Sequence, residues 1–458
     1  MLLAFIGLYI LSTLAIGWWA STKVKSTQDF VVAGQNMPLV VAASALFATW
    51  FGSETMMGAS SEFVEHGLIG VIEDPFGASL CLFLVGIFFA RPLYRMNILT
   101  FNDYFRIRFG KQSEFVSAVF MIPSYFGWIA AQLLAMAIIL KVIAGVPEIY
   151  GIMISTIVVV FYTYIGGMWA VSITDFVQTV VITIGLLIIT YVMLDRVGGV
   201  VKLFEESPKG FFNLLPEANF KSSVEYFAAW ITIGLGSIPQ QDVFQRIMSS
   251  KSEQTAVRAS YLSALMYLFI AMLPLIIAYC GKVLYPEILK DDAQMLLPQM
   301  VLQHGSLFLQ IMFFGALLSA IMSTTSGAIL APATVLGENL IKPYYKEELS
   351  DKKLLLIMRL SVIMVAIISA FMAVQGENIF DLVAQSSALS LVSLFMPLAA
   401  GLYWKKASNA GSLLSMIFGM AVWIYCEWMV FEYPSLVYGL IASITGMVLG
   451  TLIWKREA

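Results

Sequence analysis

Residues 48–58 read A-T-W-F-G-S-E-T-M-M-G and lie inside an apolar run, residues 38–70, that is long enough to cross a bilayer. The middle of this run, G-S-E-T at 52–55, suits neither lipid nor an unbroken helix. A charged side chain at membrane depth costs roughly 2.5–3.5 kcal/mol and usually faces a cavity or a partner. Unwound backbone at that depth is tolerated only where it lines protein or a water-filled site. The stretch predicts a discontinuous helix whose carbonyls bind an ion and a substrate; the alternative is a kinked helix with Glu54 paired to a neighbour.

A second apolar run is interrupted in the same way. Residues 233–246 read I-G-L-G-S-I-P-Q-Q-D-V-F-Q-R, with the pair Gly236 and Ser237 close to Pro239. Two spans interrupted by Gly or Pro at corresponding places in the two halves of a chain are the best sequence indication of a transporter binding site. The sequence therefore predicts that these two stretches face each other.

The composition indicates an all-α integral membrane protein. Hydrophobic residues make up 60% of the 458 residues and charged residues 12%, against about 25% charged in soluble domains. A net charge of −3 gives no support to a nucleic-acid partner. Three scattered cysteines and two histidines form neither a disulfide framework nor a metal cluster. Because no P-loop or nucleophile–base pattern occurs either, we do not expect an enzyme, and we expect no organic cofactor.

Apolar segments of about 20 residues give the expected number of membrane helices, which is about thirteen. They lie near 2–21, 38–66, 72–94, 114–143, 147–166, 171–195, 225–247, 255–282, 305–338, 354–374, 378–403, 410–430 and 434–454. An N-terminus outside and a C-terminus in the cytoplasm place most Lys and Arg residues in cytoplasmic loops, as the positive-inside rule requires. The expected location is the plasma (cytoplasmic) membrane.

The two broken spans divide the chain, which we read as a single transmembrane domain (1–458). After a leading helix and loop (1–37), they begin two groups of five helices, 38–195 and 225–403, and residues 404–458 add two C-terminal helices. An odd number of helices per group makes the second group enter from the opposite side of the membrane. Such an inverted repeat places a site between the broken spans near the bilayer midplane.

Hydroxyl side chains crowd the stretch S-A-I-M-S-T-T-S at 319–326, within an apolar segment. The spacing of Ala320, Ser323 and Thr324 puts them on one helix face. A hard monovalent cation prefers several neutral oxygens, which a backbone carbonyl, two hydroxyls and carbonyls of the first broken span would supply. The alternative is that the hydroxyls bond their own helix or join helices. The expected sodium ligands are Gly52, Thr55, Ala320, Ser323 and Thr324.

Four carboxylates in apolar surroundings are further candidates. Asp175, with Thr174 and Gln178, is either part of a polar lining or a first-turn carboxylate favourable to a helix dipole. Glu54 and the pair Glu73 and Asp74 suggest an acidic site for a cationic or polar substrate. The alternative for the pair is an exposed first turn at the start of the next helix.

Five motifs, taken in chain order, resemble those of the sodium:solute symporter family. They are D-F-V-V-A-G (29–34), the broken stretch 48–58, Y-I-G-G-M-W-A-V-S-I-T-D-F-V-Q (164–178), Q-D-V-F-Q-R (241–246) and A-I-M-S-T-T-S (320–326). The resemblance covers nearly the whole chain. It implies a LeuT-type inverted repeat of five plus five helices with an extra leading helix, and sodium-driven symport of a small organic solute by alternating access.

The same resemblance implies site residues. The family's conserved sodium site falls on the five ligands given above. A second sodium site would use Asp175, Ser323 and Ser326, and its remaining ligand position is Gly327 here.

Within the family, the chain resembles the high-affinity choline transporter branch at T-W-F-G (49–52), at 236–250 and at 297–303. Choline recognition implies a cage of aromatic rings around a quaternary ammonium. Trp50 matches one cage position, Gln240 replaces another, and a third falls near Trp128 or Ile129. The candidate substrate-binding residues are therefore Trp50, Glu54, Glu73, Trp128 and Gln240.

The leading interpretation is a symporter of a small organic solute, cationic or choline-like, whose partners are the solute, sodium and the lipid bilayer. Proton coupling through Glu54 and Asp175 is an alternative, because buried carboxylates carry protons in many transporters. A substrate sensor with a transporter fold is another. A channel is not supported, since no acidic ring or filter-like repeat occurs. The sequence carries no prediction of the oligomeric state.

Overall fold

The computed structural model describes residues 2–290, 293–345, 349–376, 378–429 and 431–453. Within these ranges every regular element is a helix, apart from an isolated bridge between Met37 and Ser250. Ten of the described helices are long and apolar enough to cross a membrane, judged by length and composition. The predicted all-α membrane fold is confirmed.

The first half of the chain runs from the leading helix to a long kinked helix. Its main elements are α1 (Leu2–Ser21), α2 (Thr27–Val32), α3 (Leu39–Phe47), η2 (Glu54–Gly58), α4 (Ala59–His66), η4 (Ile72–Gly77), α5 (Ala78–Leu84), α6 (Ala90–Arg95), α7 (Phe101–Phe109), α8 (Lys111–Met121), α9 (Phe126–Ala144) and α10 (Glu148–Val197).

The second half begins after a long connection. Its main elements are α11 (Val200–Glu205), α12 (Phe220–Gly236), α13 (Gln241–Ser249), α14 (Glu253–Ile270), α15 (Met272–Leu284), α16 (Leu296–His304), α17 (Leu307–Val335), η9 (Leu336–Ile341), α18 (Asp351–Gln375), α19 (Ile379–Ser390), η11 (Leu391–Phe395), α20 (Met396–Tyr403), α21 (Asn409–Trp428) and α22 (Ser435–Ile453).

Both predicted helix breaks are present. α3 ends at Phe47, residues 48–52 form turns, and helical structure resumes with the π-helical turn η2. α12 ends at Gly236, and α13 begins at Gln241 after turns that contain Pro239, which has no N–H to continue a helix. The two interruptions were predicted because Gly, Ser and Pro stand out locally in an apolar run.

The predicted number of thirteen spans is not confirmed. The expected helices 147–166 and 171–195 lie within α10, which is kinked at Gly167, where φ is 51° and ψ −159°. α3 has 9 residues, too few for a full crossing, and α12 has 17, at the lower limit for one. Breaking a helix at mid-membrane shortens its pieces, and this accounts for the lower number of full-length helices.

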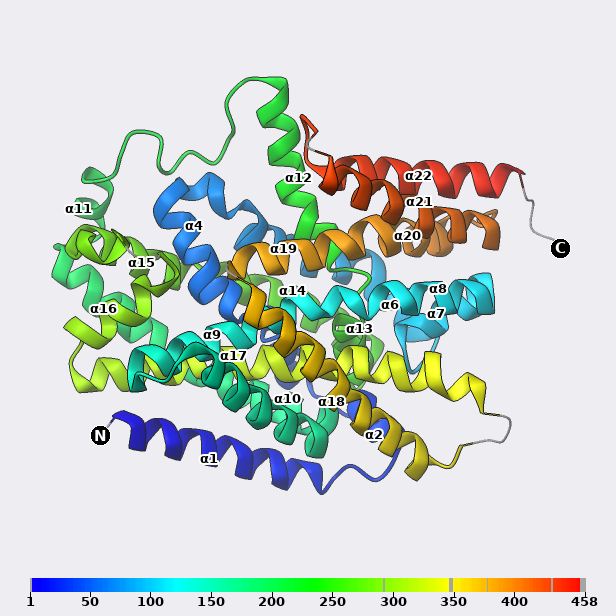
Figure 1. Ribbon diagram of the computed structural model, residues 1–458, viewed down its shortest axis with the longest axis horizontal. Helices are drawn as coiled ribbons and strands as arrows, with labels where there is room; N and C mark the ends of the chain where they lie inside the picture. Colours follow the sequence, from blue (N-terminus) through cyan, green and yellow to red (C-terminus); the bar gives the residue numbers. More distant parts are fainter. Residues whose placement is uncertain (1, 291–292, 346–348, 377, 430, 454–458) are drawn as a thin grey trace.

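α17 lies at the centre of the bundle, and nearly every side chain from Phe313 to Val335 is buried. It packs against α1, α9, α10, α13 and α18. In Figure 1, α1 lies along one outer edge, and α21 and α22 lie along the opposite edge. The start of α1 and the end of α22 lie at opposite ends of the bundle.

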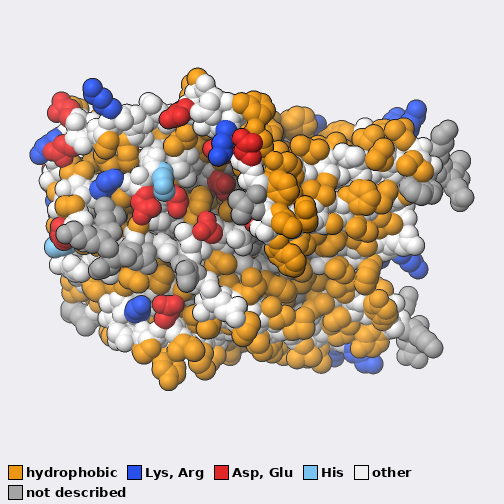
Figure 2. Space-filling model, turned by 45° about the horizontal axis from the view of Figure 1, so that its top comes forward, with side chains coloured by type: hydrophobic (Ala, Val, Ile, Leu, Met, Phe, Trp, Pro, Cys, Tyr) orange, Lys and Arg blue, Asp and Glu red, His pale blue; other side chains and the backbone are white. Residues whose placement is uncertain are grey.

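The outer surface has the character expected of a protein in lipid. Large apolar side chains are exposed along α1, including Leu8 and Leu11, and along α18, including Ile367 and Phe371. Figure 2 shows that apolar side chains cover the middle of the face in view, whereas acidic side chains gather toward one end. This distribution supports a multi-pass membrane protein.

Candidate functional site

The two helix breaks meet at one cavity. Its lining comes from the first break, η2, η4, α5, α9, the second break with the end of α12, α14 and α19. The lining residues are Trp50, Glu54, Asp74, Ala78, Trp128, Ile233, Ser237, Gln240, Tyr267, Val383, Ser386 and Ser387. The space open to the centre of a water-sized sphere is about 10 Å³, which is about the room that one water molecule needs. The cavity is therefore closed tightly around its lining in this conformation.

Four of the five predicted substrate-binding residues line this cavity: Trp50, Glu54, Trp128 and Gln240. Trp128 lines it and Ile129 does not, so the uncertain aromatic position falls on Trp128. The structure does not bring Glu73 into the lining. The neighbouring carboxylate, Asp74, lies there instead.

Glu54 is buried, and its carboxyl group accepts hydrogen bonds from two side chains of α9. Oε1 accepts from Nε1 of Trp128 at 3.2 Å, and Oε2 accepts from Nε2 of Gln132 at 2.6 Å. Both donors are neutral, so these bonds orient the carboxyl group without balancing a charge on it. The alternative was a kinked helix with Glu54 paired to a neighbour. The structure agrees with it in that Glu54 has hydrogen-bond partners. It differs in that these partners are neutral and that the carboxyl group also lines the cavity.

Gln132 holds the first break in place, and the sequence reasoning missed it. Its Oε1 accepts a hydrogen bond from the backbone N–H of Ser53 at 2.9 Å, while its amide nitrogen binds Glu54. A helix break leaves backbone groups that need such partners. The available signal was a single glutamine in the otherwise apolar stretch 126–140.

Asp74 is 1% exposed, which overturns the interpretation of Glu73 and Asp74 as an exposed pair. Its two carboxyl oxygens accept hydrogen bonds from the hydroxyls of Thr55 at 2.6 Å and Tyr267 at 2.7 Å. Asp74 has an extended backbone, with φ −138° and ψ 119°, inside η4. This conformation differs from the regular helical start that the sequence suggested, which explains the inward direction of the side chain.

The predicted sodium ligands of α17 reach the first break. The Thr324 hydroxyl donates to the carbonyl of Ala48 at 3.0 Å. It also lies 2.8 Å from the position that a Cβ atom on Gly52 would occupy. Neutral oxygens of α17 and of the broken span are thus adjacent, as a sodium site requires.

One detail differs from the predicted sodium site. α17 runs unbroken through Ala320, so no break in the helix frees the Ala320 carbonyl; its second lone pair is what an ion would use. The hydroxyl of Thr55 faces Asp74 and Tyr267, which leaves its backbone carbonyl as the predicted sodium ligand.

Asp175 is fully buried in α10, about two turns beyond the kink at Gly167, and is not a first-turn residue. Its Oδ1 accepts a hydrogen bond from Ser323. Asp175 therefore meets the α17 hydroxyl cluster, as the polar-lining interpretation predicts. The Ser326 hydroxyl donates to the Ser323 carbonyl at 2.9 Å and therefore does not donate to Asp175.

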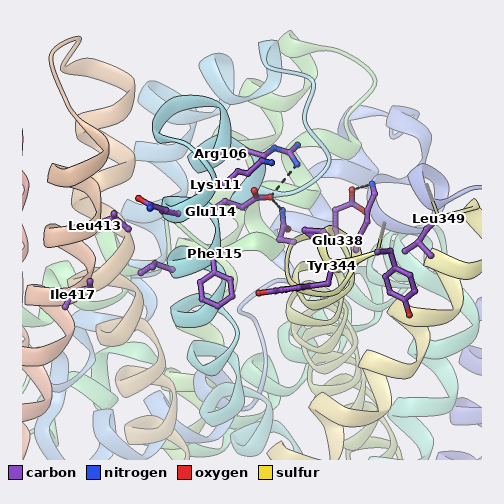
Figure 3. A pocket seen from close by; sticks show the side chains of 15 residues that line it. Arg106, Lys111, Glu114, Phe115, Glu338, Tyr344, Leu349, Leu413 and Ile417 are labelled. Carbon is purple, nitrogen blue, oxygen red and sulfur yellow. Dashed lines mark hydrogen bonds and ion pairs between the residues drawn. The ribbon is translucent and has the colours of Figure 1, made fainter. Parts of the chain in front are cut away.

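A larger cavity lies elsewhere and has a volume of about 920 Å³. It is lined by parts of α7, α8, η9 and α21, and it shares no residue with the cavity between the breaks. Figure 3 shows two ion pairs in its lining, Arg106 with Glu114 at 3.6 Å and Glu338 with Lys342. We do not place the transport site there, because both acidic side chains of the lining already have a basic partner and neither predicted helix break lines it.

The comparison with known proteins decides the family. The profile of the sodium:solute symporter family matches residues 30–419. The chain belongs to this family. A high-affinity choline transporter 1 of Drosophila melanogaster is 30% identical over 91% of this chain and 69% of its own length. The osmoregulated proline transporter OpuE of Bacillus subtilis is 28% identical over 99% and 95%.

Solved structures agree on the fold. A Na⁺-coupled sialic acid symporter in a substrate-bound outward-open state has a TM-score of 0.87 at 17% identity, covering 100% of this chain and 98% of its own. Mhp1, a nucleobase-cation-symport-1 family transporter in a closed conformation, has a TM-score of 0.61 at 16% identity, covering 93% and 94%.

As a member of the sodium:solute symporter family, the protein is a sodium-coupled membrane symporter. Its fold is of the LeuT type, as in the solved structures. They are transporters and not enzymes, in agreement with the sequence prediction.

Proposed function

We propose that this sodium:solute symporter carries a small organic cation, and that the cation binds in the cavity between the two helix breaks. The observation that carries the proposal is the pair of carboxyl groups in the lining. Glu54 and Asp74 face the same cavity, and no described residue of the lining has a basic side chain. Buried carboxylates are costly unless a cation balances them, so a positively charged solute is the partner that suits this cavity.

The chemistry of the lining favours an amine that carries N–H groups over a quaternary ammonium. Trp50 and Trp128 bring two aromatic rings to the lining, but Gln240 lies at the position where the resemblance to the choline branch implies another cage residue. Each carboxylate has acceptor capacity beyond the hydrogen bonds already described. A protonated amine donates hydrogen bonds to such oxygens, whereas choline has no N–H to donate.

Several finer features belong to the same proposal. Sodium would bind Gly52, Thr55, Ala320, Ser323 and Thr324, beside the substrate cavity. The chain would form thirteen crossing segments, with 38–195 and 225–403 as inverted repeats after the leading segment 1–37 and before the C-terminal helices 404–458. The N-terminus would lie outside and the C-terminus in the cytoplasm. The start of α1 and the end of α22 lie at opposite ends of the bundle in Figure 1, which supports opposite sides of the membrane for the two termini.

The test is solute-evoked current from reconstituted protein under an inward sodium gradient, repeated with potassium. The panel holds choline, betaine, proline, a sugar, a polyamine and a set of primary amines. We expect a sodium-dependent current for a protonated amine. Transport of choline or of a neutral solute, without transport of protonated amines, would contradict the proposal that the substrate is a protonated amine. Currents that persist in potassium and follow pH point to proton coupling, and silence across the panel favours a sensor.

Replacing Asp74 by asparagine is expected to raise the half-saturating concentration for uptake of the transported amine at least tenfold. Asparagine removes the charge and leaves Thr55 or Tyr267 facing an amide nitrogen. A hydrogen bond to a charged group is worth roughly 1.5–3 kcal/mol, and every ~1.4 kcal/mol is a factor of about ten. Uptake of labelled solute against concentration gives the measurement.

The matched control is Glu73→Gln, which neutralises the adjacent carboxyl group outside the cavity lining. Its half-saturating concentration should stay within about twofold of the wild-type value, because the half-buried Glu73 does not line the cavity and glutamine keeps its size. Equal losses in Asp74→Asn and Glu73→Gln would mean that the effect comes from the fold of η4 and not from the cavity.

A further inference from the structure

The buried carboxylate Asp175 has a positively charged side chain of the protein beside it, that of Arg246. Arg246 of α13 is 1% exposed, and Asp175 is fully buried. Nη2 of Arg246 lies 3.6 Å from Oδ2 of Asp175, so the two side chains form a buried ion pair. A guanidinium keeps its charge in proteins, and burial of both ions requires that they balance each other.

Arg246 is held at this place by further hydrogen bonds. Its Nε donates to the carbonyl of Ala45 in α3 at 2.8 Å, and its Nη1 donates to the carbonyl of Asp242 at 3.3 Å. The planar guanidinium is therefore oriented by α3 and α13 independently of Asp175. A side chain fixed in this way loses little further freedom by pairing with Asp175.

Gly327 of α17 provides the space for the guanidinium. A Cβ atom at Gly327 would lie 2.2 Å from Nη2 and 3.1 Å from Cζ of Arg246. Any side chain at this position, including a serine, would displace the guanidinium. Gly327 is the position at which the sequence lacks the remaining ligand of the second sodium site.

The other ligands expected for that second sodium are also engaged. Oδ1 of Asp175 accepts from Ser323, and the Ser326 hydroxyl is turned back to the Ser323 carbonyl. Oδ2 of Asp175 accepts no hydrogen bond from the described residues, and the Arg246 guanidinium lies 3.6 Å from it. The residues present thus fit a tethered cation and do not fit a second sodium ion.

We propose that the Arg246 guanidinium takes the place of a second sodium ion beside Asp175, so that this symporter moves its solute with one sodium ion. The inference rests on the sodium site proposed at Ser323 and Thr324. Asp175 then acts as a positioning residue, because it orients the Ser323 hydroxyl while the arginine balances its charge. The chain keeps the acidic residue without needing a second ion to neutralise it.

The test counts sodium ions bound to the purified full-length protein, with radioactive ²²Na⁺ at equilibrium as the probe. We expect one sodium per chain and a binding curve without cooperativity. Ser326→Ala should keep that number and change half-saturation by less than about twofold, whereas Thr324→Ala should weaken binding by at least about tenfold. If Arg246→Gln folds, it should gain sodium binding, because Oδ2 of Asp175 then faces space without a cation.

Two results would overturn the inference, and they differ. Two sodium ions in the wild type, one of which is lost in Ser326→Ala, would show that a second site exists despite Arg246. No bound sodium in the wild type would overturn the sodium coupling on which the inference rests, and the inference with it. The comparison of wild type with Ser326→Ala decides between these outcomes even if Arg246→Gln does not fold.

Discussion

Gly52→Ala should abolish sodium-driven uptake while the helical bundle stays folded. A Cβ atom at this position would lie 2.6 Å from Oε1 of Gln132, 2.8 Å from Oγ1 of Thr324 and 2.9 Å from Oε2 of Glu54. These three oxygens sit at the ends of side chains that can move, so the chain accommodates the methyl group without unfolding. The same movement separates the proposed sodium ligand Thr324 from the broken span and disturbs the carboxyl group that lines the cavity.

The measurement pairs uptake into proteoliposomes with the melting temperature of the purified protein. Gly315→Ala is the matched control, because Gly315 also lies in a membrane helix and a Cβ atom there would meet nothing within 4 Å. We expect the control to retain uptake and, with the higher helix propensity of alanine, to be at least as stable as the wild type. Normal uptake by Gly52→Ala would show that the three oxygens have no shared role in transport.

Much of the fold was open to prediction because the informative residues interrupt apolar runs. Gly52 and the 236–239 stretch mark both breaks, and the spans between them follow from hydrophobic length alone. The number of full crossings was less accessible. Whether a short piece such as α3 counts as a crossing depends on how the two halves of a broken helix stack, and hydropathy does not contain that information.

The site was predicted in part, and the missing residues have a common cause. Trp50, Glu54, Trp128 and Gln240 line the cavity between the breaks, and their binding of substrate stays a prediction. Of the pair Glu73 and Asp74, both named from the sequence, only Asp74 lines the cavity, because the extended backbone of Asp74 inside η4 changes the direction of its side chain. Gln132 depends on a helix far along the chain that packs beside the first break. Such partners become visible only in three dimensions.

The position of Arg246 against Gly327 is a second contact that could not be predicted from the sequence. In the sequence, Gly327 reads as the loss of a ligand, and Arg246 is the last residue of a separate motif, Q-D-V-F-Q-R (241–246). In the structure, the missing side chain is the space that the guanidinium occupies. A substitution that looks like a defect in one motif is thus coupled to a charged residue in another, and the two should be judged together.

The second large effect is expected for Glu54→Gln, which should abolish transport of the organic cation but leave sodium binding in place. The carboxyl group accepts from Nε1 of Trp128 and Nε2 of Gln132, both of which are donors. A glutamine presents one NH₂ group to one of these donors, so a buried polar group loses its partner and the negative charge disappears. Leaving a buried group unsatisfied costs about 1–3 kcal/mol, and loss of the charge removes the balance for the cation.

Solute-evoked current and ²²Na⁺ binding, measured on the same preparation, separate the two roles that Glu54 could have. Loss of current with sodium binding retained assigns the carboxyl group to the solute. Loss of both would make Glu54 a sodium ligand and would contradict the cationic-substrate proposal. Glu427→Gln is the control, because Glu427 is an exposed carboxylate late in α21 that accepts a hydrogen bond from Ser435 and lies outside the cavity. Since Glu427 cannot balance a charge between the helix breaks, its neutralisation should change neither signal.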